Sequence, residues 1–283
     1  MVKTLFSCLL LLFLFIELRA QSAAEKLEAI GKEMLESKSE DSRIAAGLHL
    51  QKYLDSLTQS GEIFRVEFDS VRSVSAVRPD DNEFLLITWN VPLQSGKVAN
   101  HGFLVDKEKR SHELNDVKSQ ISKPEQQRLL RGDWYGVLYY QVKKFRHRKS
   151  TYYVLLGYDA ADSYTTGKVI DVLSFTKNGE PVFGAPLFSG KRTQKRVLFY
   201  YREGASFSLR FDKQGGGILF DHLSPIEAAV SGDAAFMAPD FTVDAFNWKK
   251  GRFNYLQNID ARNEGKNEGN QKKPIEKGLR PKN

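Results

Sequence analysis

The sequence predicts an α+β fold that is mainly antiparallel β-sheet, sandwich-like or barrel-like, with a helical pair at its N-terminus. Before Gly61 the apolar residues recur at helical spacing, and from Phe64 onward short β-branched and aromatic runs alternate with turn residues. Successive strands joined by short turns pair antiparallel, and no predicted helix has the spacing of a βαβ unit. A small β-propeller is the alternative, because strand clusters recur at intervals of roughly forty to fifty residues.

Residues 1–20 have the three parts of a secretory signal peptide. A basic start at Lys3 precedes the apolar run Leu5–Ile16, and the small residue Ala20 closes the segment. The apolar run is about twelve residues long, shorter than the roughly twenty that a helix needs to span a bilayer. We therefore expect cleavage after Ala20 and no transmembrane span in the mature chain.

The mature chain is predicted to contain no cysteine. Cys8 is the single cysteine of the sequence and lies within the signal peptide. Disulfides, cysteine nucleophiles and thiolate metal sites are therefore excluded from the exported product. The sequence also lacks an Asn-x-Ser/Thr glycosylation site. These features favour a periplasmic or envelope-associated protein of a bacterium.

The remaining chain divides into a helical segment (residues 21–60), a β-rich domain (61–263) and a tail (264–283). The tail has six Lys/Arg and three Glu with only two apolar residues, a composition that predicts disorder. The formal charge of the whole chain is +7. The tail supplies six minus three, or +3, of that charge. The folded part is thus only mildly basic, and nucleic acid is not an expected partner.

The N-terminal helices follow from capping and periodicity. Ser22 and Glu25 form a capping-box pattern ahead of the first apolar stripe, and a second stripe over residues 44–57 ends at Gly61. We expect the pair to pack on the β-rich domain, with a partner-binding helix as the alternative. Two further helices are predicted over residues 113–132 and 225–230, each with a capping-box pattern.

The predicted strands are bounded by turn residues. The dipeptide Asn178-Gly179 predicts a tight hairpin, because it tolerates the positive φ angles of such turns. The predicted strands are Phe64–Phe68, Phe84–Val91, Val169–Phe175, Pro181–Phe183, Phe207–Phe211, Ile218–Phe220, Phe241–Trp248 and Phe253–Ile259.

Strong catalytic and cofactor-binding motifs are missing from the sequence, which favours a noncatalytic protein without a cofactor. Asp221 and His222 follow an apolar strand and form the best candidate acid/base pair. A turn-capping Asp and a half-buried His are the preferred interpretation. Asp159 and Asp162 could hold a cation such as calcium. An Asp-stabilised turn is the preferred interpretation, because the spacing differs from that of an EF-hand loop.

Basic clusters are the clearest functional feature of the folded part. The run 143–149 carries five Lys/Arg in seven residues between aromatic strands, and the run 191–196 repeats the pattern. Together they could bind phosphate or carboxylate groups of an anionic envelope lipid or glycan. Solvated hairpin tips that discourage aggregation are the alternative. The candidate ligand-binding residues are Lys143, Lys144, Arg146, Arg148, Lys149, Lys191, Arg192, Lys195 and Arg196.

From about Tyr152 to Asn263, roughly two-fifths of the chain, the sequence resembles a family of exported proteins of Gram-negative bacteria. The resemblance implies export and a β-rich fold, and it implies no activity or cofactor. Upstream, Trp89–Pro92 and Asp133–Gly136 are also similar to this family. The matching segments are Tyr152–Asp159, Lys168–Leu173, Ser208–Asp212, Phe220–Leu223 and Asn258–Asn263.

The sequence therefore predicts a noncatalytic binding or structural module of the bacterial envelope, which contacts anionic ligands through its basic loops. The alternative is an envelope hydrolase that uses dispersed carboxylates together with His222.

Overall fold

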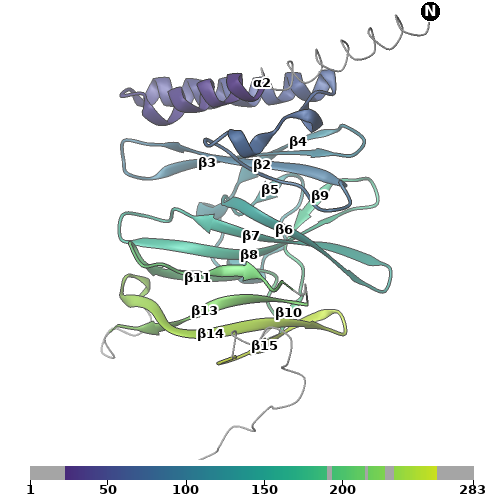
Figure 1. Ribbon diagram of the computed structural model, residues 1–283, viewed down its shortest axis with the longest axis vertical. Coiled ribbons are helices and arrows are strands. Elements are labelled where there is room, and N and C mark those ends of the chain that lie inside the picture. The colour runs from purple at the N-terminus through teal and green to yellow at the C-terminus, as the bar shows by residue number, and fades with distance from the viewer. Residues whose placement is uncertain (1–22, 190–192, 214–215, 227–232, 260–283) are drawn as a thin grey trace, which may run out of the picture.

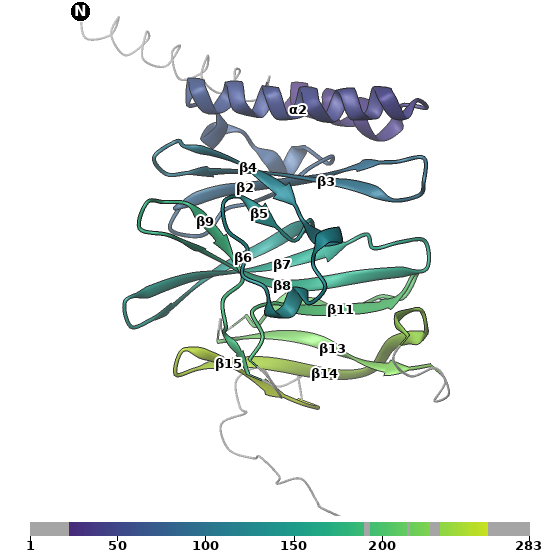
Figure 2. The same ribbon diagram turned by 180° about the vertical axis from the view of Figure 1, so that it is seen from behind.

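The computed structural model describes residues 23–189, 193–213, 216–226 and 233–259. These residues form a layer of two helices and three β-sheets, stacked one on another (Figures 1 and 2). The α+β class with mainly antiparallel sheet is confirmed. Within the described ranges each sheet is an open row of strands, and the layers are stacked rather than arranged around an axis, so the sandwich description holds and the propeller alternative does not.

The helical layer consists of a first helix (residues 23–36) and α2 (Glu40–Ser60). Ser39 caps α2, because its side chain accepts a hydrogen bond from the Ser42 amide. Gly61 ends the helix with φ of 74°, the left-handed conformation that glycine adopts at low cost. The predicted helical pair is thus confirmed, while the predicted cap at Ser22 lies outside the described residues.

The first sheet has the strand order β1-β2-β3-β4-β5. Its first four strands pair antiparallel, and β5 pairs parallel with β4. The strands are β1 (Ser75–Val77), β2 (Phe84–Pro92), β3 (Val98–Asp106), β4 (Ser111–Asp116) and β5 (Asp133–Trp134).

The second sheet has the order β11-β8-β7-β6, with β9 paired to β8, and all pairs are antiparallel. The hairpin predicted at Asn178-Gly179 joins β8 to β9. Gly179 has φ of 83°, and Thr176 N donates to Glu180 O at 2.9 Å. The strands are β6 (Leu138–His147), β7 (Ser150–Asp159), β8 (Thr165–Phe175), β9 (Pro181–Phe183) and β11 (Val197–Arg202).

The third sheet has the order β10-β15-β14-β13-β12. Its pairs are antiparallel except for β10 with β15. The strands are β10 (Phe188–Ser189), β12 (Leu209–Phe211), β13 (Gly217–Pro225), β14 (Met237–Lys249) and β15 (Arg252–Leu256).

Two of the predicted elements are wrong. Phe64–Phe68 is not a strand, because two 3₁₀ turns occupy this stretch and turn Ile63 and Val66 onto the helices. Residues 113–132 do not form the predicted helix either. The chain there completes β4, makes two 3₁₀ turns and enters β5. The 3₁₀ elements are η1 (Ile63–Arg65), η2 (Phe68–Ser70), η3 (Lys118–Gln120), η4 (Pro124–Gln126) and η6 (Ala234–Phe236).

The helix predicted over residues 225–230 falls largely on residues outside the described ranges. Pro225 itself is the last residue of β13. Among the described residues, neither helix is long and apolar enough to cross a membrane.

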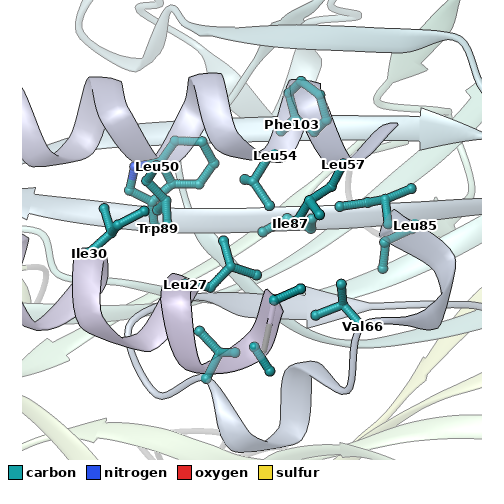
Figure 3. Packing of buried hydrophobic residues seen from close by; sticks show 14 of the residues in the cluster. Leu27, Ile30, Leu50, Leu54, Leu57, Val66, Leu85, Ile87, Trp89 and Phe103 are labelled. Atoms are coloured by element: carbon teal, nitrogen blue, oxygen red, sulfur yellow. The ribbon is translucent and has the colours of Figure 1, made fainter. Parts of the chain in front are cut away.

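Three hydrophobic cores lie between the four layers, because side chains alternate across each strand. On β2, Leu85, Ile87 and Trp89 face the helices, where they meet residues such as Leu27 and Leu54 (Figure 3). The intervening residues of β2 pack toward the second sheet. The helical pair therefore covers one face of the first sheet, as expected for an amphipathic pair.

The second sheet is buried on both faces. Tyr153 and Leu155 of β7 pack against the first sheet, and Val154 and Leu156 pack against the third. This arrangement explains why β7 and β8 read as continuous apolar runs rather than alternating ones. A strand with two covered faces has no solvent-facing positions for polar residues.

His101 makes the stability of the first sheet depend on pH. Its ring stacks on Trp89 at 5.5 Å between centroids. Burial lowers the pKa of His101, although the Glu113 and Asp116 carboxylates oppose this effect. The unfolded chain then binds the proton more tightly than the folded chain, so stability falls as pH drops through about 6.5. We expect His101→Gln to reduce the change in urea midpoint between pH 7.5 and 5.5, and an unreduced change would contradict this assignment.

Candidate functional site

Two hairpins end side by side at one edge of the molecule (Figures 1 and 2). The β6–β7 hairpin turns between His147 and Ser150, and the β14–β15 hairpin turns between Lys249 and Arg252. The two turns are in contact, because a side chain at Gly251 would clash with the His147 ring. Gly251 also has φ of 82°, so this position favours glycine for both reasons.

An aromatic cluster fastens the two hairpins together beneath their turns. The Phe145 ring lies 5.1 Å from Trp248 and 4.9 Å from Phe253, measured between centroids. Trp248 and Phe253 lie 4.8 Å apart in the same way. Aromatic contacts at these separations add to the burial of apolar area. The hairpin ends are therefore held as one unit, although they belong to different sheets.

The alternation of β6 separates the basic side chains of the run 143–149. Lys144 turns toward the first sheet and forms an ion pair with Asp81. Lys143 turns toward the third sheet, where its ammonium lies 5.9 Å from the Phe211 ring centroid. Arg146, Arg148 and Lys149 are exposed. Of the five predicted residues, these three are therefore best placed to meet a ligand in solution.

The second hairpin adds three more exposed cations, which the sequence argument did not assign to a site. Lys249, Lys250 and Arg252 flank the turn that contacts His147. Their pattern Lys-Lys-Gly-Arg was visible in the sequence, but nothing local places it beside residues 143–149. We call the exposed cations of the two adjoining hairpin ends, Arg146, Arg148, Lys149, Lys249, Lys250 and Arg252, the basic surface. Within it, Arg146 lies on the same face of β6 as Lys144, on the side of the first sheet.

Among the described residues, the basic surface lacks an ion-paired carboxylate. None of its six residues forms an ion pair with a described residue, and the stretches 143–158 and 245–258 contain no Asp or Glu. Like charges gathered at one place raise the local positive potential and attract anions. The arrangement suits phosphate or carboxylate groups, for which Lys and Arg side chains are the usual partners in proteins.

The second predicted basic loop does not form such a surface. Lys191 and Arg192 lie outside the described residues. Lys195 turns to the segment before β5, where its ammonium donates to Gln126 O. Arg196 is completely buried, and its Nε donates to Asp171 Oδ2 at 2.8 Å. The expectation that Arg196 belongs to a solvated ligand-binding loop is therefore corrected.

Arg196 belongs to a buried polar network between the first and second sheets. Tyr139 Oη donates to the same Asp171 Oδ2 at 2.9 Å, and Arg196 Nη1 donates to Pro124 O at 2.9 Å. Burial disfavours the charge of Arg196, but the nearby Asp171 carboxylate raises its pKa above the ordinary value overall. The network ties η4 to β8. These contacts explain why the segment between β4 and β5 does not form the predicted helix.

A neighbouring network ties η3 to β7 and β11. Lys118 Nζ lies 2.7 Å from Asp159 Oδ1, and Tyr200 Oη donates to Asp159 Oδ2 at 2.8 Å. Tyr135 Oη lies 2.9 Å from Tyr200 Oη, and burial raises the pKa of Tyr135 to about 12. Because Arg196 also lies over the Tyr135 ring, the two networks meet at this residue.

The two carboxylates considered for a cation have other partners. Asp159 is buried and forms an ion pair with Lys118. Asp162 accepts hydrogen bonds from the amides of Tyr164 and Thr165, both at 2.8 Å. These amide bonds are the main cause of the lowered pKa of Asp162. Within the part of the chain that the structure describes, no three metal-ligating side chains gather. Asp162 therefore stabilises the turn between β7 and β8, while Asp159 belongs to a buried ion pair.

Asp221 and His222 have different hydrogen-bond partners rather than one another. Asp221 Oδ2 accepts from the Ser208 amide at 2.7 Å. His222 Nδ1 instead lies 2.7 Å from Asp244 Oδ2 on β14. The Asp244 carboxylate is 2 % exposed and also accepts from Tyr255 Oη and the Asn258 amide.

A bulge in β14 shapes the surroundings of His222. The β13–β14 register shifts between Asp221 and Leu223, so the three residues from Asp240 to Thr242 lie opposite His222 alone. Asp240 holds the bulge by accepting from the Thr242 hydroxyl at 2.7 Å, the Ser224 hydroxyl at 2.8 Å and the Thr242 amide at 3.0 Å. These bonds lower the pKa of Asp240 to about 2.

Comparison with known proteins adds no assignment to this geometry. No family model matches the chain, and no curated protein matches it.

Proposed function

We propose that this protein is a noncatalytic binding module of the bacterial envelope, and that it holds an anionic ligand on the basic surface. The observation that carries the proposal is the contact between two hairpin ends of different sheets that together carry six exposed Lys/Arg. Their mutual repulsion is tolerated because the turns face water, where charges are screened over about 8 Å at physiological ionic strength. A bound anion would remove that repulsion and gain several contacts at once.

Neutralising the basic surface should weaken binding to a polyanion. We expect the variant Arg146→Gln, Arg148→Gln, Lys249→Gln, Lys250→Gln to elute from immobilised heparin at clearly lower salt than the unaltered protein. The reason is that each lost cation removes an electrostatic contact and reduces counterion release. The salt concentration at elution is the measurement.

A control variant with the same change in net charge separates a local site from overall charge. Lys52→Gln, Arg65→Gln, Arg72→Gln, Lys97→Gln removes four exposed cations from other parts of the molecule. The control should elute close to the unaltered protein. Elution of the two quadruple variants at the same salt concentration would contradict the proposal, because binding to heparin would then depend on net charge alone.

The contact between His222 and Asp244 favours a second candidate function, an envelope hydrolase. A buried carboxylate on Nδ1 orients the ring and leaves Nε2 for proton transfer, as in acid/base catalysis. If ester, phosphoester or glycoside substrates are turned over, His222→Ala should lower kcat at least about a hundredfold, in line with general acid/base contributions. Asp221→Asn is the matched control, since Asp221 has a different partner, the Ser208 amide. Undiminished turnover by His222→Ala would exclude this candidate.

A further inference from the structure

The shape of the basic surface indicates what kind of anion it meets. Arg148, Lys149 and Lys250 lie in the two turns, and Arg146, Lys249 and Arg252 lie at the strand ends beside them. All six side chains are exposed. The two hairpins project at one edge of the molecule (Figure 1). A small anion at such tips reaches one or two cations, whereas an extended anionic surface reaches all of them together. Recognition of small ligands instead uses concave sites with convergent polar groups.

We propose that the basic surface docks onto the anionic face of a lipid bilayer, with the two hairpin turns directed at the headgroups. This inference rests on the proposed function and names its ligand. Lys and Arg residues near an anionic bilayer each strengthen binding about fivefold. Since the stretches 143–158 and 245–258 lack acidic residues, the two hairpin ends themselves add no negative charge that would repel the headgroups.

Aromatic residues at the base of the turns support a bilayer over a soluble polyanion. Trp248 and Tyr152 lie on the two hairpins that carry the cations, and each packs on the core between the second and third sheets while part of its ring stays exposed. Trp and Tyr are enriched where proteins meet the membrane interface, because their rings combine apolar area with a polar group. Cations flanking such rings form the usual composition of an interfacial contact.

The test uses flotation of the full protein with vesicles. We expect binding to vesicles of phosphatidylcholine with phosphatidylglycerol, and none to phosphatidylcholine alone. Binding should weaken with added salt, because the contact is electrostatic. The quadruple variant of Arg146, Arg148, Lys249 and Lys250 should bind at least about tenfold more weakly, while the control variant of equal charge should bind as the unaltered protein does.

Two further arms locate the contact. Replacing the six Lys/Arg of residues 264–283 by Gln should leave most of the binding, and loss of binding in that variant would assign it to the C-terminal segment and overturn the proposal. Trp89 and Trp134 are buried, so an emission shift on vesicle addition reports on Trp248, the third tryptophan. The shift should disappear in Trp248→Phe.

The outcomes distinguish this inference from the function on which it rests. If the basic surface binds heparin but the protein does not bind charged vesicles, the bilayer is not the ligand. A soluble glycan or another polyanion is then the ligand of the basic surface. If the quadruple variant behaves like the control with heparin and with vesicles, both proposals fail.

Discussion

Asp171→Ala is expected to lower the free energy of unfolding by about 3–5 kcal/mol, the cost of leaving a buried charge without its partner. Asp171 and Arg196 are both completely buried. The Asp171 carboxylate is the single ion-pair partner of Arg196 among the described residues, and Arg196 Nη2 already has no hydrogen-bond partner there. The substitution would leave the guanidinium with a carbonyl oxygen and the Tyr135 ring. Urea unfolding followed by tryptophan fluorescence measures the change.

Two comparison variants separate the charge from ordinary packing. Tyr139→Phe removes one hydrogen bond to Asp171 and should cost only about 1 kcal/mol. The double variant Asp171→Leu, Arg196→Met removes both charges and should be more stable than Asp171→Ala. If Asp171→Ala costs no more than Tyr139→Phe, the ion pair does not stabilise the interface between the first and second sheets.

Phe253→Ala is expected to destabilise the protein by about 3–5 kcal/mol through the cavity that it leaves. The Phe253 ring is completely buried and lies 4.9 Å from Phe145, 5.3 Å from Phe188 and 4.8 Å from Trp248. It therefore joins β15 to β6 across the core between the second and third sheets. The urea midpoint at constant m-value is the measurement, since a change in m would indicate a different unfolding process.

Phe253→Leu is the control, because it keeps most of the buried volume and should cost less than about 1.5 kcal/mol. A loss below about 1 kcal/mol in Phe253→Ala would show that this aromatic cluster does not hold the two hairpins together. In that case the basic surface would not be a unit either, because its two halves depend on the same contacts.

Local chemistry accounts for the elements that the sequence predicted well. Ser39 and Gly61 bound α2 through capping bonds within a few residues of each helix end. Gly179 permits the β8–β9 turn through its own φ angle. Neither feature depends on distant parts of the chain, so pattern and propensity are enough to place them.

Contacts between distant segments account for the elements that were mispredicted. Residues 113–132 have helical capping patterns, yet Leu114 pairs with Gly102 on β3 and Pro124 O is held by Arg196. These contacts outweigh a weak local preference for helix. Asp171 within the apolar run of β8 was the visible sign of such a contact, because a charged residue in a strand buried on both faces needs a partner.

The candidate site divides in the same way. Residues 143–149 were recognised from composition alone, because five Lys/Arg in seven residues stand out without any knowledge of their neighbours in space. The contribution of Lys249, Lys250 and Arg252 was missed, because it depends on Gly251 resting against His147. Arg196 was included wrongly, because its neighbours in sequence are basic while its neighbours in space are Asp171 and Tyr139.

The sequence by itself determined the helical pair, the antiparallel strands and one half of the basic surface, because caps, turns, periodicity and charge runs act over a few residues. Only the tertiary structure decided the stacking of three sheets, the partners of Arg196 and His222, and the joining of two hairpins into one surface. Those features depend on which apolar faces cover one another, and any strand with two apolar faces admits several such pairings. The choice is made by packing across the whole chain, in which Phe145, Trp248 and Phe253 meet from different sheets.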